Sequence, residues 1–210
     1  MAITKFEGQY ACFSNYYMCK VIFDEQDFRN SEAAYQAQKY AKQKSRNIYR
    51  TMAPSTAHLR GQKIKPLRPK WDEVKDDLMY KVVFEKFYQN KNIQEILLST
   101  GDEEIINEND YHDNYWGVCS CEKCRSENIE EQNKLGKILM KVREDIPIRL
   151  QRDEEKRISH EIRFARWNEE MNEKERINIS LENYSQLSNN NSNDDKTENY
   201  NKENKYFFET

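Results

Sequence analysis

The chain has 210 residues, of which 37% are hydrophobic and 34% are charged, and its formal net charge is −3. This length fits one domain with an appendage, and no apolar run reaches the roughly 18–20 residues that a membrane span needs. The acidic balance argues against a general nucleic-acid coat, which depends on an excess of Lys and Arg. Because the N-terminal residues lack the apolar core of a secretory signal, we expect a cytoplasmic protein with no membrane partner.

Hydrophobic spacing and turn signals predict a helix-rich α+β domain with few short strands over residues 1–146. From the N-terminus, the predicted elements are a short strand at 21–23, a turn at 24–27, a helix from about 32 to 42 capped by Ser31, and a short helix capped by Ser55 that ends at Gly61. A long amphipathic helix after Pro69 and helices at 93–98 and 129–143 follow.

The composition changes sharply near residue 146. Residues 147–182 are highly charged and carry a weak helical stripe, so we expect a solvated helical extension there. Residues 183–210 are rich in Asn and contain too few apolar side chains to offset the entropy cost of ordering the chain. The sequence therefore predicts a disordered C-terminal tail.

One predicted helix carries an unusual polar face. Glu32, Tyr35, Gln36 and Lys39 are spaced three or four residues apart and so share one side of that helix. A carboxylate, two hydrogen-bonding groups and an ammonium are atypical of core packing and indicate a site. A solvated helix with a Glu–Lys arrangement is the alternative.

Two further polar and aromatic clusters lie outside the periodic core. The first is Phe13-Ser14-Asn15-Tyr16 at a predicted turn, and the second is the segment 110–117, Asp-Tyr-His-Asp-Asn-Tyr-Trp-Gly. In the second, large aromatic side chains surround a carboxylate next to a glycine that permits close approach, which suits a pocket for a flat ring. A structural turn is the alternative.

These clusters belong to a set of motifs whose order and spacing hold over roughly residues 5–146. The motifs are Gly-Gln-Tyr-Ala-Cys-Phe-Ser-Asn at 8–15, Ser31-Glu32 with Tyr35-Gln36 and Lys39, Arg-Pro-Lys-Trp at 68–71, Met79 with Lys86-Phe87, Leu-Leu-Ser-Thr-Gly-Asp at 97–102, Asp-Asn-Tyr-Trp-Gly at 113–117, and Asn-Lys-Leu-Gly-Lys-Ile-Leu-Met at 133–140 with Arg143. With them the chain resembles the NADAR family, also called YbiA-like proteins. One departure is Ala33, because relatives often have His after the glutamate.

The resemblance implies an N-glycosidase domain that hydrolyses the C1–N bond of a ribosylated base, and we expect it to need no metal and no cofactor. Two substrates stay open. One is a 5-phosphoribosylamino-pyrimidine of the riboflavin pathway, which would release ribose 5-phosphate. The other is ADP-ribosylated guanine in nucleic acid, for which the basic segment 63–70 is the best candidate rim. A non-catalytic module that senses NAD or ADP-ribose is the alternative function, and the sequence does not decide the oligomeric state.

The family positions implied for the site match Glu32, Trp71, Asp113 and Trp116. We expect Glu32 to be the main catalytic carboxylate, which stabilises the ribosyl cation or activates water, and Asp113 to be the second polar group. The two indoles would stack on the base. Phe13, Ser14, Asn15 and Lys39 would complete the pocket, and Lys39 and Arg68 are the candidates for phosphate. The alternatives are a core anchor for Trp71, a surface position for Arg68 and a structural pair of Lys39 with Glu32.

Cys119, Cys121 and Cys124 form a C-x-C-x-x-C run that lies outside the motifs of the resemblance. Three thiols fall one short of a tetrahedral zinc site, and His112, Cys12 or Cys19 would complete it only if the fold brings one of them near. The pattern lacks the paired motifs of zinc deaminases. We therefore expect free reduced thiols, and a zinc-dependent interaction module is a third reading of the chain.

Overall fold

The computed structural model describes residues 2–127 and 129–203, with side chains described up to residue 185, and divides the chain into two units, Met1–Gln151 and Arg152–Thr210. The first unit confirms the predicted helix-rich α+β class. Its elements in chain order are η1 (Gly8–Phe13, a 3-10 helix), β1 (Met18–Phe23), β2 (Gln26–Asn30), α1 (Ser31–Ala37), η2 (Gln43–Tyr49, a 3-10 helix), α2 (Pro54–Gly61), α3 (Trp71–Gln89), α4 (Lys91–Ser99), β3 (Glu108–Asn109), β4 (Val118–Cys119), α5 (Glu122–Ser126) and the start of α6 (Lys134–Glu203).

The first two strands form an antiparallel hairpin, of which the sequence predicted only β1 and the turn. Asp24 and Glu25 both have positive φ angles, 50° and 61°, as in the two-residue turns that match the twist of a hairpin. Val21 pairs with Phe28, and both side chains are buried in the core. Of the three buried residues of β2, Gln26, Phe28 and Asn30, only Phe28 is apolar, which explains why this short run gave no strand signal.

Helix α1 begins at Ser31, and its N-cap is Asn30. The Asn30 side chain accepts a hydrogen bond from the Ala33 N–H at 2.8 Å and donates one to the Met52 carbonyl at 3.0 Å. The prediction of Ser31 as the cap is therefore wrong, because the Ser31 hydroxyl donates to the Asn15 amide oxygen instead. The helix also ends at Ala37 rather than near residue 42, since the next residues form tighter turns.

The boundaries of two other helices also differ from the prediction. Helix α2 starts with Pro54 in its first turn after Ala53, so Ser55 is not its cap. A proline there loses nothing, because the first N–H groups of a helix have no partner within it. Helix α6 starts at Lys134 rather than 129, after Asn133, whose amide binds the Ile105 carbonyl at 3.0 Å and the Asn107 N–H at 3.0 Å.

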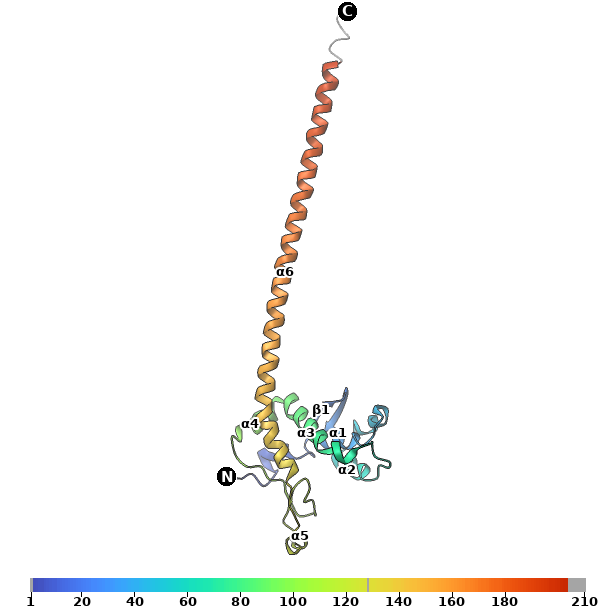
Figure 1. The fold of residues 1–210 in the computed structure, drawn as a ribbon, viewed down its shortest axis with the longest axis vertical. Helices are drawn as coiled ribbons and strands as arrows, with labels where there is room; N and C mark the ends of the chain where they lie inside the picture. Colours follow the sequence, from blue (N-terminus) through green and yellow to red (C-terminus); the bar gives the residue numbers. More distant parts are fainter. Residues whose placement is uncertain (1, 128, 204–210) are drawn as a thin grey trace, which may run out of the picture. The chain divides into compact units, whose positions relative to one another are not determined.

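The core lies between α3 and the elements that pack on it. All seven residues of α1 are buried, and α1 contacts α2, α3 and the hairpin. The predicted long helix and the short helix after it are confirmed as α3 and α4. In Figure 1, β1, α1, α2 and α3 gather in one part of the first unit, while α5 lies away from them on its own loop. This arrangement buries α1 almost wholly in the interior and so fixes the polar face that it carries.

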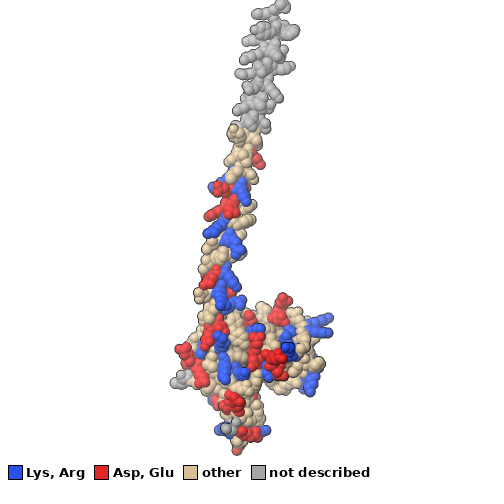
Figure 2. Space-filling model, viewed as in Figure 1, with Lys and Arg blue, Asp and Glu red and all other residues tan. Residues whose placement is uncertain are grey.

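The described part of the second unit consists of α6 from residue 152 to residue 203, and it confirms the predicted charged helical extension. Its described side chains up to residue 185 are almost all exposed, and basic and acidic residues alternate along the face in Figure 2. Trp167 is exposed and stacks on Phe164, with ring centroids 5.9 Å apart. The side chains of 186–203 and all of 204–210 lie outside the described residues, so the disorder predicted for 183–210 stays a prediction. None of the described helices is long and apolar enough to cross a membrane.

Candidate active site

A cavity of about 450 Å³ opens where α1, α2 and α3 meet two loops, and its volume is typical of sites for small ligands. It collects residues from all three polar clusters of the sequence. Its lining consists of Ser14, Asn15, Tyr16, Glu32, Tyr35, Gln36, His58, Met79, Asn107, Tyr111, Asp113, Trp116 and Leu135.

Glu32 is the most enclosed charged group in this lining, with a relative exposure of 5%. Its Oε1 accepts a hydrogen bond from Gln36 Nε2 at 2.9 Å and lies 3.0 Å from His58 Nδ1. Its backbone N–H donates to the Asn15 carbonyl at 3.0 Å, which ties α1 to the loop after η1. The carboxylate is therefore held from two sides, and both contacts use the same oxygen.

His58 is a site residue that the sequence analysis did not find. It comes from α2, 26 residues after Glu32, and no motif connects the two positions. Its hydrogen bond to Glu32 raises the pKa of His58 above its ordinary value, although partial burial opposes this. Its Nε2 lies 2.9 Å from Gln62 Nε2. The imidazole thus orients the Glu32 carboxylate.

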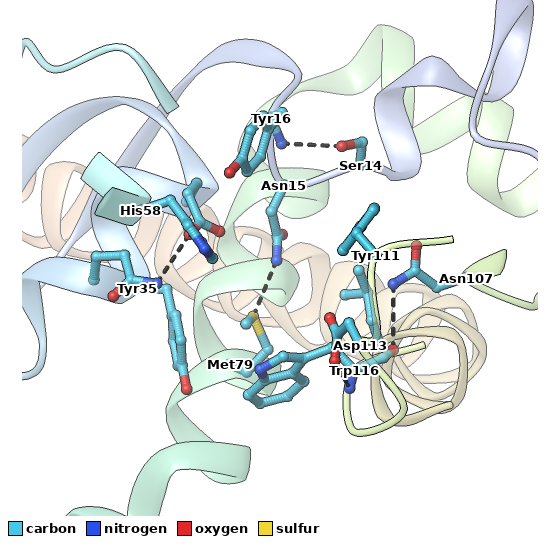
Figure 3. A pocket seen from close by; sticks show the side chains of 13 residues that line it. Ser14, Asn15, Tyr16, Tyr35, His58, Met79, Asn107, Tyr111, Asp113 and Trp116 are labelled. Carbon is cyan, nitrogen blue, oxygen red and sulfur yellow. Dashed lines mark hydrogen bonds and ion pairs between the residues drawn. The ribbon is translucent and has the colours of Figure 1, made fainter. Parts of the chain in front are cut away.

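Tyr16 lies beside His58 in the cavity lining, with ring centroids 6.3 Å apart. Burial and the nearby Glu32 charge raise the pKa of Tyr16 to about 12, so its phenol stays protonated. Figure 3 shows the Asn15 amide pointing at the Met79 sulfur, with Tyr16 and His58 on one side of it and Tyr111, Asp113 and Trp116 on the other.

Asp113 and Trp116 come from one loop and are joined by a turn. Asp113 Oδ1 accepts a hydrogen bond from the Trp116 N–H at 2.9 Å, while its backbone binds the Asn109 side chain. The Trp116 indole packs edge-on against Tyr35, with centroids 5.5 Å apart. The predicted second carboxylate and one predicted indole therefore both reach the cavity, where Asp113 has one oxygen engaged in the turn.

Four predicted substrate-binding residues do not line the cavity. Phe13 is completely buried and packs on other aromatic rings of the core, so it supplies packing rather than a binding surface. Trp71 is 8% exposed, and its ring centroid lies 5.5 Å from that of Tyr35. This position agrees with the alternative that Trp71 is a core anchor. Lys39 and Arg68 are the other two.

Lys39 and Arg68 bind backbone carbonyls near α1. Lys39 Nζ donates to the Gly61 carbonyl at 3.1 Å, and burial lowers the pKa of Lys39. Arg68 is half-buried, and its backbone N–H donates to the Lys39 carbonyl at 2.8 Å. Among the described residues that line the cavity, none is Lys or Arg, so its walls carry two carboxylates and one histidine. A phosphate would lie at the rim rather than inside.

The C-x-C-x-x-C loop lies next to the cavity loop and brings together a group with metal-binding chemistry. One ligand atom from each of His112, Cys119, Cys121 and Cys124 lies within 4.8 Å of the others, whereas Cys12 and Cys19 are not part of the group. The fourth ligand that the sequence left open is thus close by.

Comparison with known proteins identifies relatives of the first unit. The NADAR domain matches residues 4–147. The N-glycosidase Npun_R5314 of Nostoc punctiforme is 36% identical over 142 residues, 65% of this chain and 86% of that protein. The N-glycosidase YbiA of Escherichia coli K12 is 33% identical over 141 residues, 66% of this chain and 83% of that one. The riboflavin biosynthesis protein VVA0006 of Vibrio vulnificus is 30% identical over 135 residues, 63% of this chain and 35% of that protein.

A solved structure agrees with the fold. The NMR structure of E. coli YbiA superposes with a TM-score of 0.60 at 29% identity, covering 72% of this chain and 86% of that one. The match therefore extends over the elements that build the cavity.

Proposed function

The chain belongs to the NADAR domain family, and we propose that its cavity hydrolyses the bond between ribose C1 and the exocyclic nitrogen of a 5-phosphoribosylamino-pyrimidine. Relatives named N-glycosidases match over most of their length, so this chain is an enzyme that hydrolyses N-glycosyl bonds. The substrate and the roles of the residues are the proposal.

The observation that carries the proposal is the buried Glu32 carboxylate in the cavity wall. Gln36 and His58 both bind Oε1, and in the described part of the chain Oε2 makes no hydrogen bond. Because Oε1 is engaged, Oε2 is the atom that can accept a proton from water or stabilise positive charge on the ribose. A sensor of the intact ligand would not need a carboxylate at this position.

The reaction divides between the two carboxylates. As the C1–N bond breaks, the ribose ring gains positive charge and the departing nitrogen gains an electron pair. Glu32 Oε2 accepts a proton from the water that adds its oxygen to C1. The departing nitrogen takes up a proton from solvent and leaves as the free amine, and Glu32 returns its own proton to solvent. Asp113 is the second polar group, whose Oδ2 faces no partner in its own turn. An acidic cavity stabilises the positive charge that develops on the ribose ring in the transition state more than the uncharged ring of the bound substrate.

The base would lie against aromatic side chains. Trp116 and Tyr35 form one corner of the cavity, and Tyr111 is 68% exposed and free to cover a bound ring. Stacking on such rings contributes about 1–3 kcal/mol per base. The core position of Trp71 leaves this role to the other three rings.

The small substrate is favoured by the size of the cavity and by the name of one relative. A cavity of about 450 Å³ is in the range of sites that enclose a single small ligand. The Vibrio relative is named a riboflavin biosynthesis protein. ADP-ribosylated guanine is the second candidate, because the exposed residues Lys63, Lys65 and Lys70 follow the helix that carries His58.

A product assay tests the proposal. The full chain, Glu32→Gln and the exposed control Glu73→Gln are each given a 5-phosphoribosylamino-pyrimidine and, separately, an oligonucleotide carrying ADP-ribosyl-guanine. We expect ribose 5-phosphate and free aminopyrimidine from the first substrate with the wild type and the control, but not with Glu32→Gln. Release of ADP-ribose from the second substrate alone would transfer the assignment to nucleic acid. Tight binding of ADP-ribose without turnover of either would overturn it in favour of a sensor.

A further inference from the structure

His112, Cys119, Cys121 and Cys124, here called the thiol cluster, have the composition and spacing of a metal site. His112 Nδ1 lies 3.1 Å from Cys121 Sγ and 3.4 Å from Cys124 Sγ, and all four ligand atoms lie within 4.8 Å of one another. Around zinc, with bonds of about 2.3 Å to sulfur and about 2.0–2.1 Å to nitrogen, ligand atoms sit roughly 3.5–3.8 Å apart at tetrahedral angles. Shifts of less than about 1 Å would give the cluster that geometry.

We propose that the thiol cluster binds one structural zinc ion, which fixes the loop that carries Tyr111 and Asp113. Three thiolates and one imidazole form a closed tetrahedral set, and soft thiolate ligands select zinc over the oxygen-seeking cations. Each cysteine gives up its proton to solvent when the ion binds.

The ligands come from three neighbouring segments of the chain. His112 lies in the loop between β3 and β4, and Cys119 is the last residue of β4. Cys121 and Cys124 are the N-cap and an inner residue of α5. The Cys124 N–H donates to Cys121 Sγ at 3.3 Å. His112 has a φ angle of 67°, a conformation that non-glycine residues rarely adopt, and its backbone N–H donates to Cys119 Sγ at 3.3 Å. The unusual backbone thus turns the imidazole and its own N–H toward the sulfurs.

Asn114 supports the cluster from outside the ligand set. Its Nδ2 donates to Cys124 Sγ at 2.9 Å, and its Oδ1 accepts from the Cys119 N–H at 3.1 Å. Donors aimed at sulfur stabilise thiolates more than thiols, and groups of this kind orient the ligands of metal sites. Three separate N–H donors on three sulfurs favour metal binding over a set of unrelated reduced thiols.

The position of the cluster connects it to the cavity. His112 lies between Tyr111 and Asp113, and both of these line the cavity. Residues 110–116 around them are exposed or only partly buried, and only Cys119 and Cys124 of the thiol cluster are buried. A metal bond to His112 would hold both neighbours where apolar packing is sparse. This consequence for hydrolysis rests on the proposed function, but the metal site itself does not.

Metal analysis of the full chain, expressed with added zinc and desalted, tests the site. We expect one zinc ion per chain in the wild type and in Cys19→Ser, a control thiol outside the cluster, and almost none in the double variant Cys121→Ser, Cys124→Ser. Zinc far below one per chain in the wild type, or zinc retained by the double variant, would overturn the proposal. Iron in place of zinc would do the same.

A second measurement decides the matter if the double variant does not fold. Wild-type protein is stripped with a chelator and reloaded with Co²⁺, which reports thiolate ligands by charge-transfer absorption and tetrahedral geometry by its visible bands. We expect both signals, and their absence overturns the site. Stripping should also lower the Tm and reduce hydrolysis about ten- to a hundredfold, because misplaced site residues carry penalties of that size. If neither substrate is hydrolysed, metal content, cobalt absorption and Tm still test the zinc site alone.

Discussion

The cavity has two walls that are held in place by different means. The helix wall, Glu32, Tyr35 and Gln36 from α1 with His58 from α2, belongs to buried secondary structure, and Glu32 has a relative exposure of 5%. The loop wall, Tyr111, Asp113 and Trp116, is held by an Asn109–Asp113 turn, and Tyr111 is 68% exposed.

This difference in burial suggests different roles for the two walls, one in the chemical step and one in covering the substrate. A carboxylate whose geometry decides a reaction needs a rigid setting, which a helix packed on all sides provides. A surface that covers the substrate has to admit it first, and the exposed side chain of Tyr111 can move more readily than the buried helix, even where the proposed metal ion holds the backbone of the loop. We therefore assign the main chemical step to the helix wall and the coverage of the substrate to the loop wall.

Replacing the two carboxylates compares the walls directly. Glu32→Gln keeps the shape and removes the charge and basicity, so we expect hydrolysis to fall about a hundred- to ten-thousandfold, the range for lost acid–base catalysis. Asp113→Asn keeps an oxygen that accepts from the Trp116 N–H, so we expect a loss of only about tenfold. Single-turnover rates, with circular dichroism to verify folding, measure both effects. A larger loss for Asp113→Asn would reverse the assignment of the two walls.

Gly61→Ala tests how tightly the helix wall is packed. A Cβ at Gly61 would lie 1.9 Å from Gln36 Oε1, so Gln36 has to move away from Glu32. Overpacking of this kind costs about 1–3 kcal/mol of unfolding free energy, and we expect activity to fall as well because Glu32 loses one of its two partners. Denaturant unfolding and steady-state kinetics measure the two effects.

Gly101→Ala is the matched control for Gly61→Ala. It has a φ angle of 53° and no heavy atom within 4 Å of an added Cβ, so it costs stability through backbone strain without touching the cavity. Equal loss of activity in the two variants would mean that general destabilisation, rather than displacement of Gln36, limits hydrolysis.

The helix wall was easier to predict from the sequence than the loop wall, because residues three or four apart in one helix lie on the same face. Glu32 and Gln36 are four residues apart, and their side chains do form a hydrogen bond. His58 could not be found this way, since its approach to Glu32 depends on how α2 packs on α1. The same limit left His112 as one of three candidates for the fourth ligand of the cysteines. It also applies to Trp71, whose motif did not reveal that it packs on Tyr35 outside the cavity lining.

Lys86 binds the loop that anchors the helix wall, so its titration gives a further test of that wall. It is completely buried, and its Nζ donates to the Ser14 carbonyl at 2.7 Å, next to the loop that anchors α1 through Asn15. Burial lowers the pKa of Lys86 to about 8 from an ordinary value of 10.5. Between these two pH values the unfolded chain binds more protons than the folded one, so the free energy of unfolding rises with pH by at most about 1.4 kcal/mol per unit.

The variant Lys86→Met should lose this rise. Burial raises the pKa of the nearby thiols Cys12 and Cys19, which favours a fall in stability with pH, but both thiols are present in the two proteins. The charge of Lys86 also lowers the pKa of both thiols, so the difference between the wild type and the variant reports the lysine together with its effect on Cys12 and Cys19, and both contributions have the same sign. Denaturant unfolding at several pH values from 7.5 to 9.5 gives it, and parallel curves would show that Lys86 has no depressed pKa.

The smallest expected effect is a change in the pKa of His58, which distinguishes the influence of the helix wall from that of the loop wall. The hydrogen bond to Glu32 is the main reason why the pKa of His58 is raised above 6.5, and the charge of Asp113 is the weakest contribution. The imidazolium contact with Glu32 is therefore present at low pH and is lost as the pH rises through this elevated pKa. In an NMR titration, Glu32→Gln should lower the pKa of His58 markedly and Asp113→Asn only slightly, with His58→Gln used to assign the signal. A larger decrease in Asp113→Asn would show that the loop wall, and not the helix wall, sets the electrostatics around the histidine.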